Sequence, residues 1–89
     1  MDDYQQSLYK ALSNSIRRGI LLELQDHDQT PSYFAFIYEL SPAAITKHLK
    51  ILEEVKLIFR YRRGREVWCQ INIWALKAMK VDWLIKLLL

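Results

Sequence analysis

Ser41-Pro-Ala-Ala-Ile-Thr-Lys-His-Leu-Lys-Ile-Leu-Glu-Glu-Val55, followed one residue later by Leu57-Ile-Phe-Arg-Tyr-Arg-Arg-Gly-Arg65, is the stretch that decides the fold of this chain. The first segment predicts a helix that begins at Pro42, because the Ser41 hydroxyl can accept a free N–H of the first turn and proline suits the first helical position. The second segment has the two-residue period of a strand and is rich in arginine. A short basic helix directly before an arginine-rich hairpin indicates a nucleic-acid-binding protein.

The predicted helix over residues 42–55 has two different faces. At about 100° per residue, one side collects Ile45, His48, Leu49, Leu52 and Val55, and the opposite side collects Ala43, Thr46, Lys47 and Lys50. Small residues allow a close approach to a surface, and lysine and threonine carry donors for phosphates and base edges. We therefore expect base contacts from Ala43, Thr46 and Lys47, whereas Ser41 and Lys50 are expected at phosphates. The alternative is that this side is only the solvated face of an amphipathic helix.

Two further helices are predicted before this one. Thr30-Pro31 repeats the signal of a capping residue followed by proline, and the apolar run over residues 32–38 fits a short helix. About three residues then lead to Ser41, so the two helices form a helix-turn-helix. Asn14 can cap an earlier helix that ends near residues 25–29, and Gly19 inside it predicts close packing against a neighbouring helix.

A two-stranded hairpin is predicted on either side of Arg63-Gly64-Arg65. Leu57, Phe59 and Tyr61 alternate with Ile58, Arg60 and Arg62, and Val67, Cys69 and Ile71 alternate with Trp68 and Gln70. The hairpin carries Arg60, Arg62, Arg63 and Arg65, with no acidic residue before Glu66. Such a density of positive charge repels itself unless a polyanion is near, so we expect these four arginines to contact the DNA backbone. The alternative is a solvated, charged edge strand that prevents aggregation of the sheet.

The C-terminal segment predicts a partner. Asn72 can cap a helix from Ile73 onward, and this helix has one apolar stripe as well as a second apolar strip on another side. One small core cannot cover both, so we expect burial against a second copy of the chain. The residues expected in this homodimer interface are Tyr4, Leu8, Tyr9, Leu12, Trp74, Val81, Ile85 and Leu88. A helix lying on a membrane surface is the alternative, but its polar positions are too few and too mixed in charge to form a basic face.

Length and composition predict one small globular domain over residues 1–89. The chain is 52% hydrophobic and 12% aromatic, which excludes disorder. Its net charge of +3 is unevenly distributed, because residues 1–40 hold three basic and six acidic residues and residues 41–89 hold ten and four. We find no signal peptide and no apolar run long enough for a membrane helix, so a cytoplasmic location is expected. The one cysteine, Cys69, cannot form an internal disulfide and is expected to be a packed residue.

Four segments together resemble the small winged-helix repressors of the ArsR type found in bacteria and archaea. These segments are Ala11-Leu-Ser-Asn-Ser-Ile-Arg-Arg18, Ala44-Ile-Thr-Lys-His-Leu-Lys-Ile-Leu-Glu-Glu54, Leu57-Ile58 and Arg62-Arg-Gly-Arg65. The resemblance implies a mainly α (α+β) winged helix-turn-helix fold, with a β-hairpin wing over about residues 57–72 and a dimer built from the first and last helices. It also implies that the helix over residues 42–55 enters the major groove and that the wing lies along the backbone. We further expect Arg17 and Arg18 to flank the DNA backbone. Glu39 stands where the family usually has the glycine of the turn.

Many members of that family sense metals or thiols, and the residues for such sites are missing here. Residues 32–40 contain no cysteine, and residues 73–89 offer only Asp82 as a possible ligand. We expect His48 to be packed or to face a phosphate, and we expect no metal or other cofactor. No nucleophile stands beside a plausible base and no glycine-rich phosphate loop exists, so the chain is not expected to be an enzyme. We expect a sequence-specific, double-stranded DNA-binding homodimer that acts as a repressor. The alternative is a winged helix that binds another protein.

Overall fold

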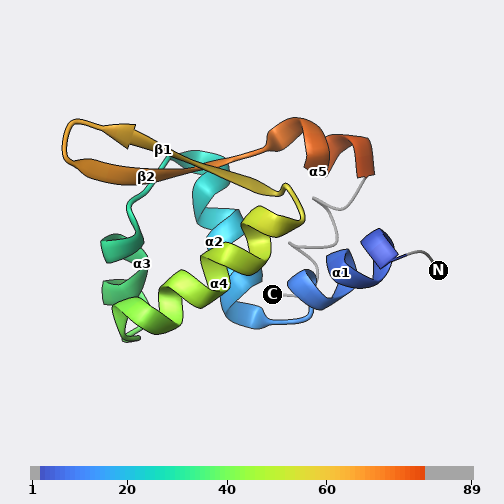
Figure 1. The fold of residues 1–89 in the computed structure, drawn as a ribbon, viewed down its shortest axis with the longest axis horizontal. Helices are drawn as coiled ribbons and strands as arrows, with labels where there is room; N and C mark the ends of the chain where they lie inside the picture. The colour runs from blue at the N-terminus through green and yellow to red at the C-terminus, as the bar shows by residue number, and fades with distance from the viewer. Residues whose placement is uncertain (1–2, 80–89) are drawn as a thin grey trace.

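The computed structural model describes residues 3–79, which form five helices and one antiparallel hairpin (Figure 1). In chain order these are α1 (Asp3–Leu12), α2 (Ser15–Asp26), α3 (Pro31–Ile37), α4 (Pro42–Glu54), β1 (Ile58–Arg63), β2 (Glu66–Ile71) and α5 (Ile73–Met79). This order confirms the predicted helix-turn-helix of α3 and α4 and the hairpin that follows it. No helix within residues 3–79 is long and apolar enough to cross a membrane.

Side-chain caps begin four of the helices where the sequence predicts them. The side chains of Asn14, Thr30, Ser41 and Asn72 accept the backbone N–H groups of Arg17, Tyr33, Ala44 and Ala75, with donor–acceptor distances of 3.1, 3.2, 3.1 and 3.3 Å. Pro31 and Pro42 then occupy the first helical positions. Each cap satisfies a donor that has no partner within its own helix, and this fixes where the helix starts.

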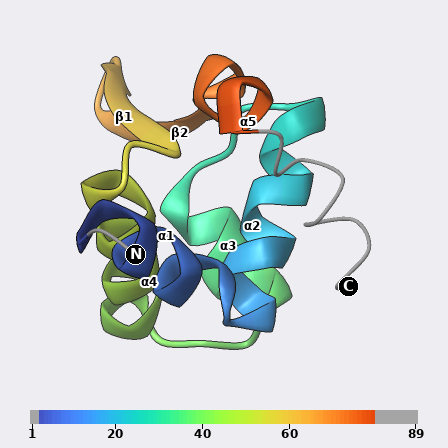
Figure 2. The ribbon, with the colours of Figure 1, turned by 90° about the vertical axis from the view of Figure 1, so that its right-hand side faces the viewer.

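The core lies where α4 packs against α2, α3 and the base of the hairpin. The predicted apolar face of α4 is buried, with Ile45, Leu49 and Leu52 at 0% exposure. Other buried members come from every remaining element: Leu8, Ala11, Leu12, Ile20, Leu21, Leu24, Phe34, Val55, Leu57, Ile58, Cys69 and Leu76. Figures 1 and 2 show that the hairpin extends toward one end of the molecule, while α1 and α5 lie at the opposite end. The core therefore lies between the tip of the wing at one end and α1 and α5 at the other.

The hairpin is joined to the loop that precedes α3. β1 and β2 pair in register from Ile58 opposite Ile71 to Arg63 opposite Glu66. Gln29 forms an antiparallel bridge to Cys69 on the other edge of β2, with N···O distances of 3.2 and 2.7 Å. β2 is therefore paired on both sides, and the wing is held at its middle by backbone hydrogen bonds.

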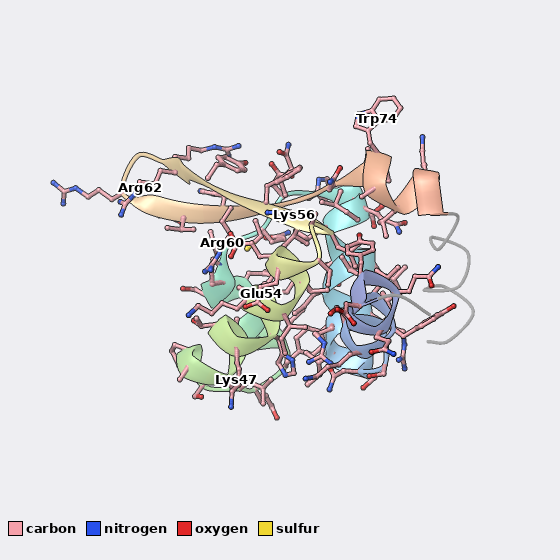
Figure 3. All side chains as sticks on the ribbon, turned by 45° about the vertical axis from the view of Figure 1, so that its right-hand side comes forward. Lys47, Glu54, Lys56, Arg60, Arg62 and Trp74 are labelled. Atoms are coloured by element: carbon pink, nitrogen blue, oxygen red, sulfur yellow. The ribbon has the colours of Figure 1, made fainter. Side chains whose placement is uncertain are left out.

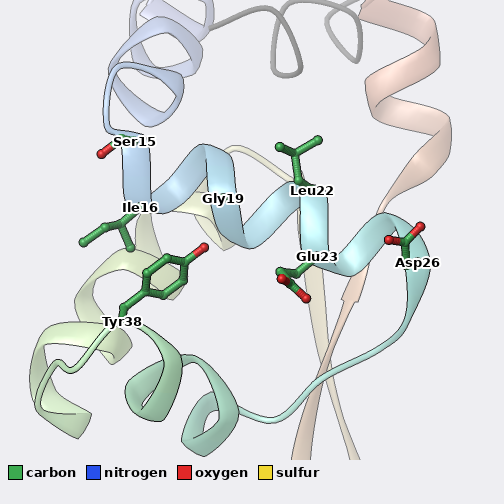
Figure 4. A pocket seen from close by; sticks show the side chains of 7 residues that line it. All are labelled: Ser15, Ile16, Gly19, Leu22, Glu23, Asp26 and Tyr38. Atoms are coloured by element: carbon green, nitrogen blue, oxygen red, sulfur yellow. The ribbon is translucent and has the colours of Figure 1, made fainter. Parts of the chain in front are cut away.

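Gly19 provides a notch in α2 for the side chain of Tyr38. A Cβ atom at Gly19 would overlap the Tyr38 hydroxyl oxygen and would lie 3.2 Å from Cζ of the same ring. Tyr38 is the residue that follows α3, and Figure 4 shows its ring directed at this part of α2. An open pocket of about 540 Å³ lies beside the ring. Gly19 is therefore closely packed, but its neighbour is the Tyr38 side chain and not the backbone of another helix.

Both helices of the helix-turn-helix end in the same hydrogen-bonded motif. After α3, Glu39 N donates to Phe36 O and Leu40 N donates to Ala35 O, at 3.3 and 3.0 Å. After α4, the donors are Lys56 N and Leu57 N and the acceptors are Glu53 O and Leu52 O, at 3.0 and 3.1 Å. This is the Schellman motif, which requires a left-handed residue directly after the helix. The left-handed residue is Glu39 after α3, with φ of 53°, and Lys56 after α4, with φ of 63°. Glycine is the usual residue at such positions.

Candidate nucleic-acid interface

The exposed face of α4 has the composition that the sequence predicts. Ala43, Thr46, Lys47 and Lys50 are all exposed, and with Ala44 they line a shallow depression of about 450 Å³. Within residues 3–79, neither lysine has a hydrogen-bond or ion-pair partner, so both ammonium groups are free for an outside ligand. Ser41 is also exposed, and its hydroxyl oxygen accepts the Ala44 N–H as the helix cap. Its proton remains free to donate to a phosphate.

A second depression adjoins this face on the side of α3. Pro31, Ser32, Ala35, Pro42 and Thr46 surround a cleft of about 220 Å³ between the two helices. Thr46 lines both depressions, so the exposed surface runs from the start of α3 across the N-terminal half of α4. The lining residues are short, and this allows a close approach by an extended partner.

The tip of the wing presents positive charge. Arg62, Arg63 and Arg65 are exposed around the turn, where Gly64 has φ of 64° and supplies the left-handed conformation. Figure 3 shows Lys47 pointing outward from α4 and Arg62 pointing outward from the wing. Figure 1 places the N-terminal half of α4 and the tip of the wing toward the same end of the molecule. The two predicted contact regions are therefore brought together by the fold.

Arg60 does not share the environment of the other wing arginines. Its guanidinium donates from Nη2 and Nε to Glu53 Oε1 of α4, at 2.7 and 3.1 Å. This hydrogen bond is the main reason that the pKa of Glu53 lies below its usual value and that of Arg60 lies above. Arg60 shares a face of β1 with the buried Ile58, and that face lies toward α4. Its charge is already balanced by Glu53, and it joins the wing to α4 instead of standing free for DNA.

Arg17 is a structural residue and not the backbone-contact residue that we expected. Only 7% of its surface is exposed. Its Nε and Nη2 donate to Ala11 O and Lys10 O at 2.8 and 2.9 Å, and its Nη1 lies 3.1 Å from His48 Nδ1. Burial of this guanidinium lowers its pKa. Arg17 therefore connects α2 to the end of α1 and to α4, and its guanidinium is engaged in these internal contacts.

Two further sequence-predicted residues, Arg18 and His48, also make internal contacts. The Arg18 side chain is half-buried and donates from Nη1 to Leu12 O at 2.8 Å. His48 is half-buried beside Arg17, and its pKa is lowered by burial first and by the positive charge of Arg17 second. His48 is thus the packed histidine of the two roles considered from the sequence.

The residues expected at a dimer interface fall into three groups. Tyr4, Tyr9 and Trp74 are exposed by 41, 56 and 78%. Leu8 and Leu12 are buried within the chain's own core, because α1 turns these positions toward α2, and this corrects their expected place at the interface. Val81, Ile85 and Leu88 lie outside the described residues. The exposed aromatic side chains come from α1 and α5, at the end of the molecule away from the tip of the wing (Figures 1 and 2).

Sequence reasoning missed the contacts that Asp28 and Trp68 make at the wing. Tyr61 donates a hydrogen bond to Asp28 at 2.5 Å, and the guanidinium of Arg63 lies over the Trp68 ring. The alternation of residues along the hairpin already places Tyr61 and Arg63 on one face, so the sequence alone could have predicted that these two side chains are neighbours. The partner strand's register and the approach of the loop before α3 were needed to add Trp68 and Asp28.

Comparison with known proteins agrees with this geometry. Residues 14–58 match the bacterial regulatory protein family arsR. The transcriptional repressor SdpR of Bacillus subtilis (strain 168) is 29% identical over 79 residues, which cover 89% of this chain and 87% of the relative. The uncharacterized HTH-type transcriptional regulator YuzN of the same organism is 33% identical over 91 residues, which cover 94% and 99%. The structure of HlyU from Vibrio cholerae N16961 has a TM-score of 0.76 and 25% identity, covering 99% of this chain and 94% of that one. The chain therefore belongs to the ArsR family of bacterial regulatory proteins, whose winged helix-turn-helix fold it has.

Proposed function

We propose that residues 1–89 form a single domain that binds double-stranded DNA sequence-specifically as a homodimer and represses transcription by occupying an operator. The observation that carries this proposal is the exposed, small and basic face of α4, which lies toward the same end of the molecule as the wing arginines. A DNA duplex is the polyanion that such a surface fits. The repressor function named for the relative from Bacillus subtilis supports the proposed outcome.

The proposed roles follow from where each side chain lies. Thr46 and Lys47 stand one turn into α4, where side chains reach base edges when the N-terminal half of a recognition helix enters the major groove. Ala43 offers a methyl group to thymine. The proposed phosphate contacts are Ser41, Lys50, Arg62, Arg63 and Arg65, which position the protein without reading sequence.

A protein-binding module is the alternative function for a winged helix of this size. Salt dependence separates the two, because binding to phosphates releases counterions and a hydrophobic contact between proteins does not. Selection from random duplex DNA by the full chain should recover a preferred operator. Affinity for that operator should fall steeply as salt concentration rises.

The substitution Lys47→Ala tests the reading role within this proposal. It should cost about 1–3 kcal/mol on the selected operator and much less on an unrelated duplex, since a base contact is lost only where the correct base is present. Lys50→Ala should weaken both duplexes about equally. Fluorescence polarisation with both duplexes measures the two constants.

A matched control is Lys56→Ala, which removes an exposed lysine just past the C-terminal end of α4. It should leave both affinities unchanged. Equal losses on both duplexes for Lys47→Ala would reassign Lys47 to a phosphate. Selection that recovered no duplex from the pool would favour the protein-binding alternative.

A further inference from the structure

The three exposed arginines at the tip of the wing differ in how firmly they are held. Arg62 and Arg65 have no hydrogen-bond, ion-pair or ring partner among residues 3–79. Arg63 has three contacts, all on one face of the hairpin. Its Nη2 donates to the Tyr61 hydroxyl at 3.0 Å, and its Cζ lies 4.5 Å from the centre of the Trp68 ring and 5.7 Å from that of Tyr61.

The hydroxyl of Tyr61 connects Arg63 to the body of the protein. A phenol hydroxyl has one proton to donate and lone pairs to accept with. Here it donates to Asp28 Oδ2 at 2.5 Å and accepts from Arg63 at 3.0 Å, so both functions are used at once. The hydrogen bond to Asp28 is also the main reason that the pKa of Tyr61 is raised, which keeps the hydroxyl protonated.

The backbone next to Asp28 is fixed in place. The next residue, Gln29, exchanges two backbone hydrogen bonds with Cys69 in the middle of β2. Tyr61 stands directly opposite Trp68 in the register of the hairpin, and Arg63 is two residues further along the same face. The guanidinium of Arg63 thus contacts the Trp68 ring and the Tyr61 hydroxyl. The hydrogen bond from Tyr61 to Asp28 connects this hydroxyl to the loop before α3.

We propose that Tyr61 is a positioning residue, which orients the guanidinium of Arg63 for one defined contact with the DNA backbone or minor groove. This rests on the proposed function. An arginine that is ordered before binding loses less side-chain freedom when the complex forms, so the same contact gives a higher affinity. Arg62 and Arg65 contribute charge without this ordering.

The experiment compares Tyr61→Phe, Arg63→Ala and the double variant on the selected operator over a range of salt concentrations. Tyr61→Phe removes the hydroxyl and keeps the ring. It should weaken binding about 3- to 10-fold with an unchanged salt slope, because no charge is lost. Arg63→Ala should lower the slope by about 1. In the Arg63→Ala background, Tyr61→Phe should have no further effect, since Tyr61 acts through Arg63.

Tyr33→Phe is the matched control, because the Tyr33 hydroxyl likewise donates to a carboxylate, that of Glu23, at 3.0 Å. It should leave DNA affinity unchanged. An equal loss from Tyr61→Phe in the wild-type and Arg63→Ala backgrounds would overturn the proposal, as would no loss in either.

A measurement on the free protein separates this proposal from the proposed function. The ¹H–¹⁵N heteronuclear NOE of the Arg63 Nε–H should exceed those of Arg62 and Arg65, and it should fall to their level in Tyr61→Phe. Equal values for all three arginines in the wild-type chain would overturn the ordering of Arg63. A wild-type chain that bound no duplex would overturn the proposed function and the role of Tyr61 at DNA, even if the NOE values stood as expected.

Discussion

Arg17 lies where three helices meet, and its guanidinium contacts both α1 and α4 from α2. Its partners are two carbonyl oxygens at the end of α1 and the ring of His48. Arg17→Ala should lower the free energy of unfolding by about 2 kcal/mol, because the buried Ala11 O loses its Arg17 donor and the contact with His48 is lost. Arg17→Lys should recover only part of this, since an ammonium lacks the planar fork of donors. Urea denaturation measures both.

A different outcome of the same experiment would place Arg17 at the DNA backbone. If Arg17→Ala kept wild-type stability but lowered the salt slope of DNA binding, then Arg17 would leave this site to contact phosphates. Wild-type DNA affinity per folded molecule is the expected outcome for both variants.

His48 gives the stability of the protein a dependence on pH. Its pKa in the folded chain is below the unfolded value near 6.5, because burial and the charge of Arg17 both oppose a second positive charge. Its contribution to stability is therefore fully present above pH about 6.5 and is lost as the pH falls below that value. His48→Asn keeps an acceptor near the position of Nδ1 and does not titrate.

Wild type should therefore lose more stability than His48→Asn between pH 7.5 and pH 5.5, two values on either side of the unfolded pKa of about 6.5. Thermal unfolding at the two pH values measures the difference. Parallel losses for the two proteins would show that other groups carry the whole pH dependence.

The residue-level errors of sequence reasoning have a common cause. Arg17 and Arg60 have the same charge as Arg62 and Arg65, and the sequence shows charge without showing which acceptors approach it. The carbonyl oxygens that bind Arg17 are freed by the end of α1, and the partner of Arg60 lies on another element. The acceptors of both arginines can be identified only once the helices and the hairpin are packed together. Lys47, Lys50 and Thr46 were predictable as exposed because a single helical period sets their face.

At the scale of elements, the two Schellman motifs of the helix-turn-helix are built with residues that disfavour the left-handed region. Glu39→Gly and Lys56→Gly should each raise the free energy of unfolding by about 0.5–1 kcal/mol, because both side chains are exposed and glycine adopts positive φ without strain. The gains should add, since the two turns share no partner. Denaturation of the single and double variants measures this.

Glu39→Ala is the control for this pair. Alanine removes the carboxylate but keeps the Cβ atom, so the strain should remain and stability should not rise. A gain for alanine equal to that for glycine would attribute the effect to charge and not to backbone conformation.

Helix starts could be predicted from the sequence, whereas the inward face of the hairpin could not. Asn14, Thr30, Ser41 and Asn72 all cap as expected, because capping depends on a local hydrogen bond within one turn. Which face of β1 turns inward depends on long-range packing. Phe59 is exposed by 46%, whereas Arg60 on the other face is half-buried against α4.

At the scale of the whole molecule, the exposed aromatic side chains of α1 and α5 predict assembly. We expect twice the 10.7 kDa chain mass in sedimentation equilibrium at micromolar concentration. Trp74, which is 78% exposed, has Lys77 above its ring at 6.0 Å. Trp74→Glu should shift the protein toward the monomer, because a carboxylate in place of the apolar ring would have to lose its hydration on association.

Phe36→Glu is the control for the dimer, since Phe36 is 83% exposed and belongs to α3, a helix that lies away from α1 and α5 in Figure 1. It should leave the mass unchanged. A wild-type protein that sediments as a monomer would contradict the proposed dimer, and a mass lowered by both variants would point to a general effect of added charge.

The bridge between Gln29 and Cys69 makes residues 30–68 a closed loop, and this loop contains both helices of the helix-turn-helix and the tip of the wing. Contacts between residues so far apart in sequence slow folding, because chain entropy is lost before the contact is gained. Cys69 is buried, and burial raises the pKa of its thiol to about 11, so it is protected while the loop is closed. Amide hydrogen exchange at Gln29 and Cys69 should therefore report the opening of the whole loop, and the Cys69 thiol should become reactive in that same event.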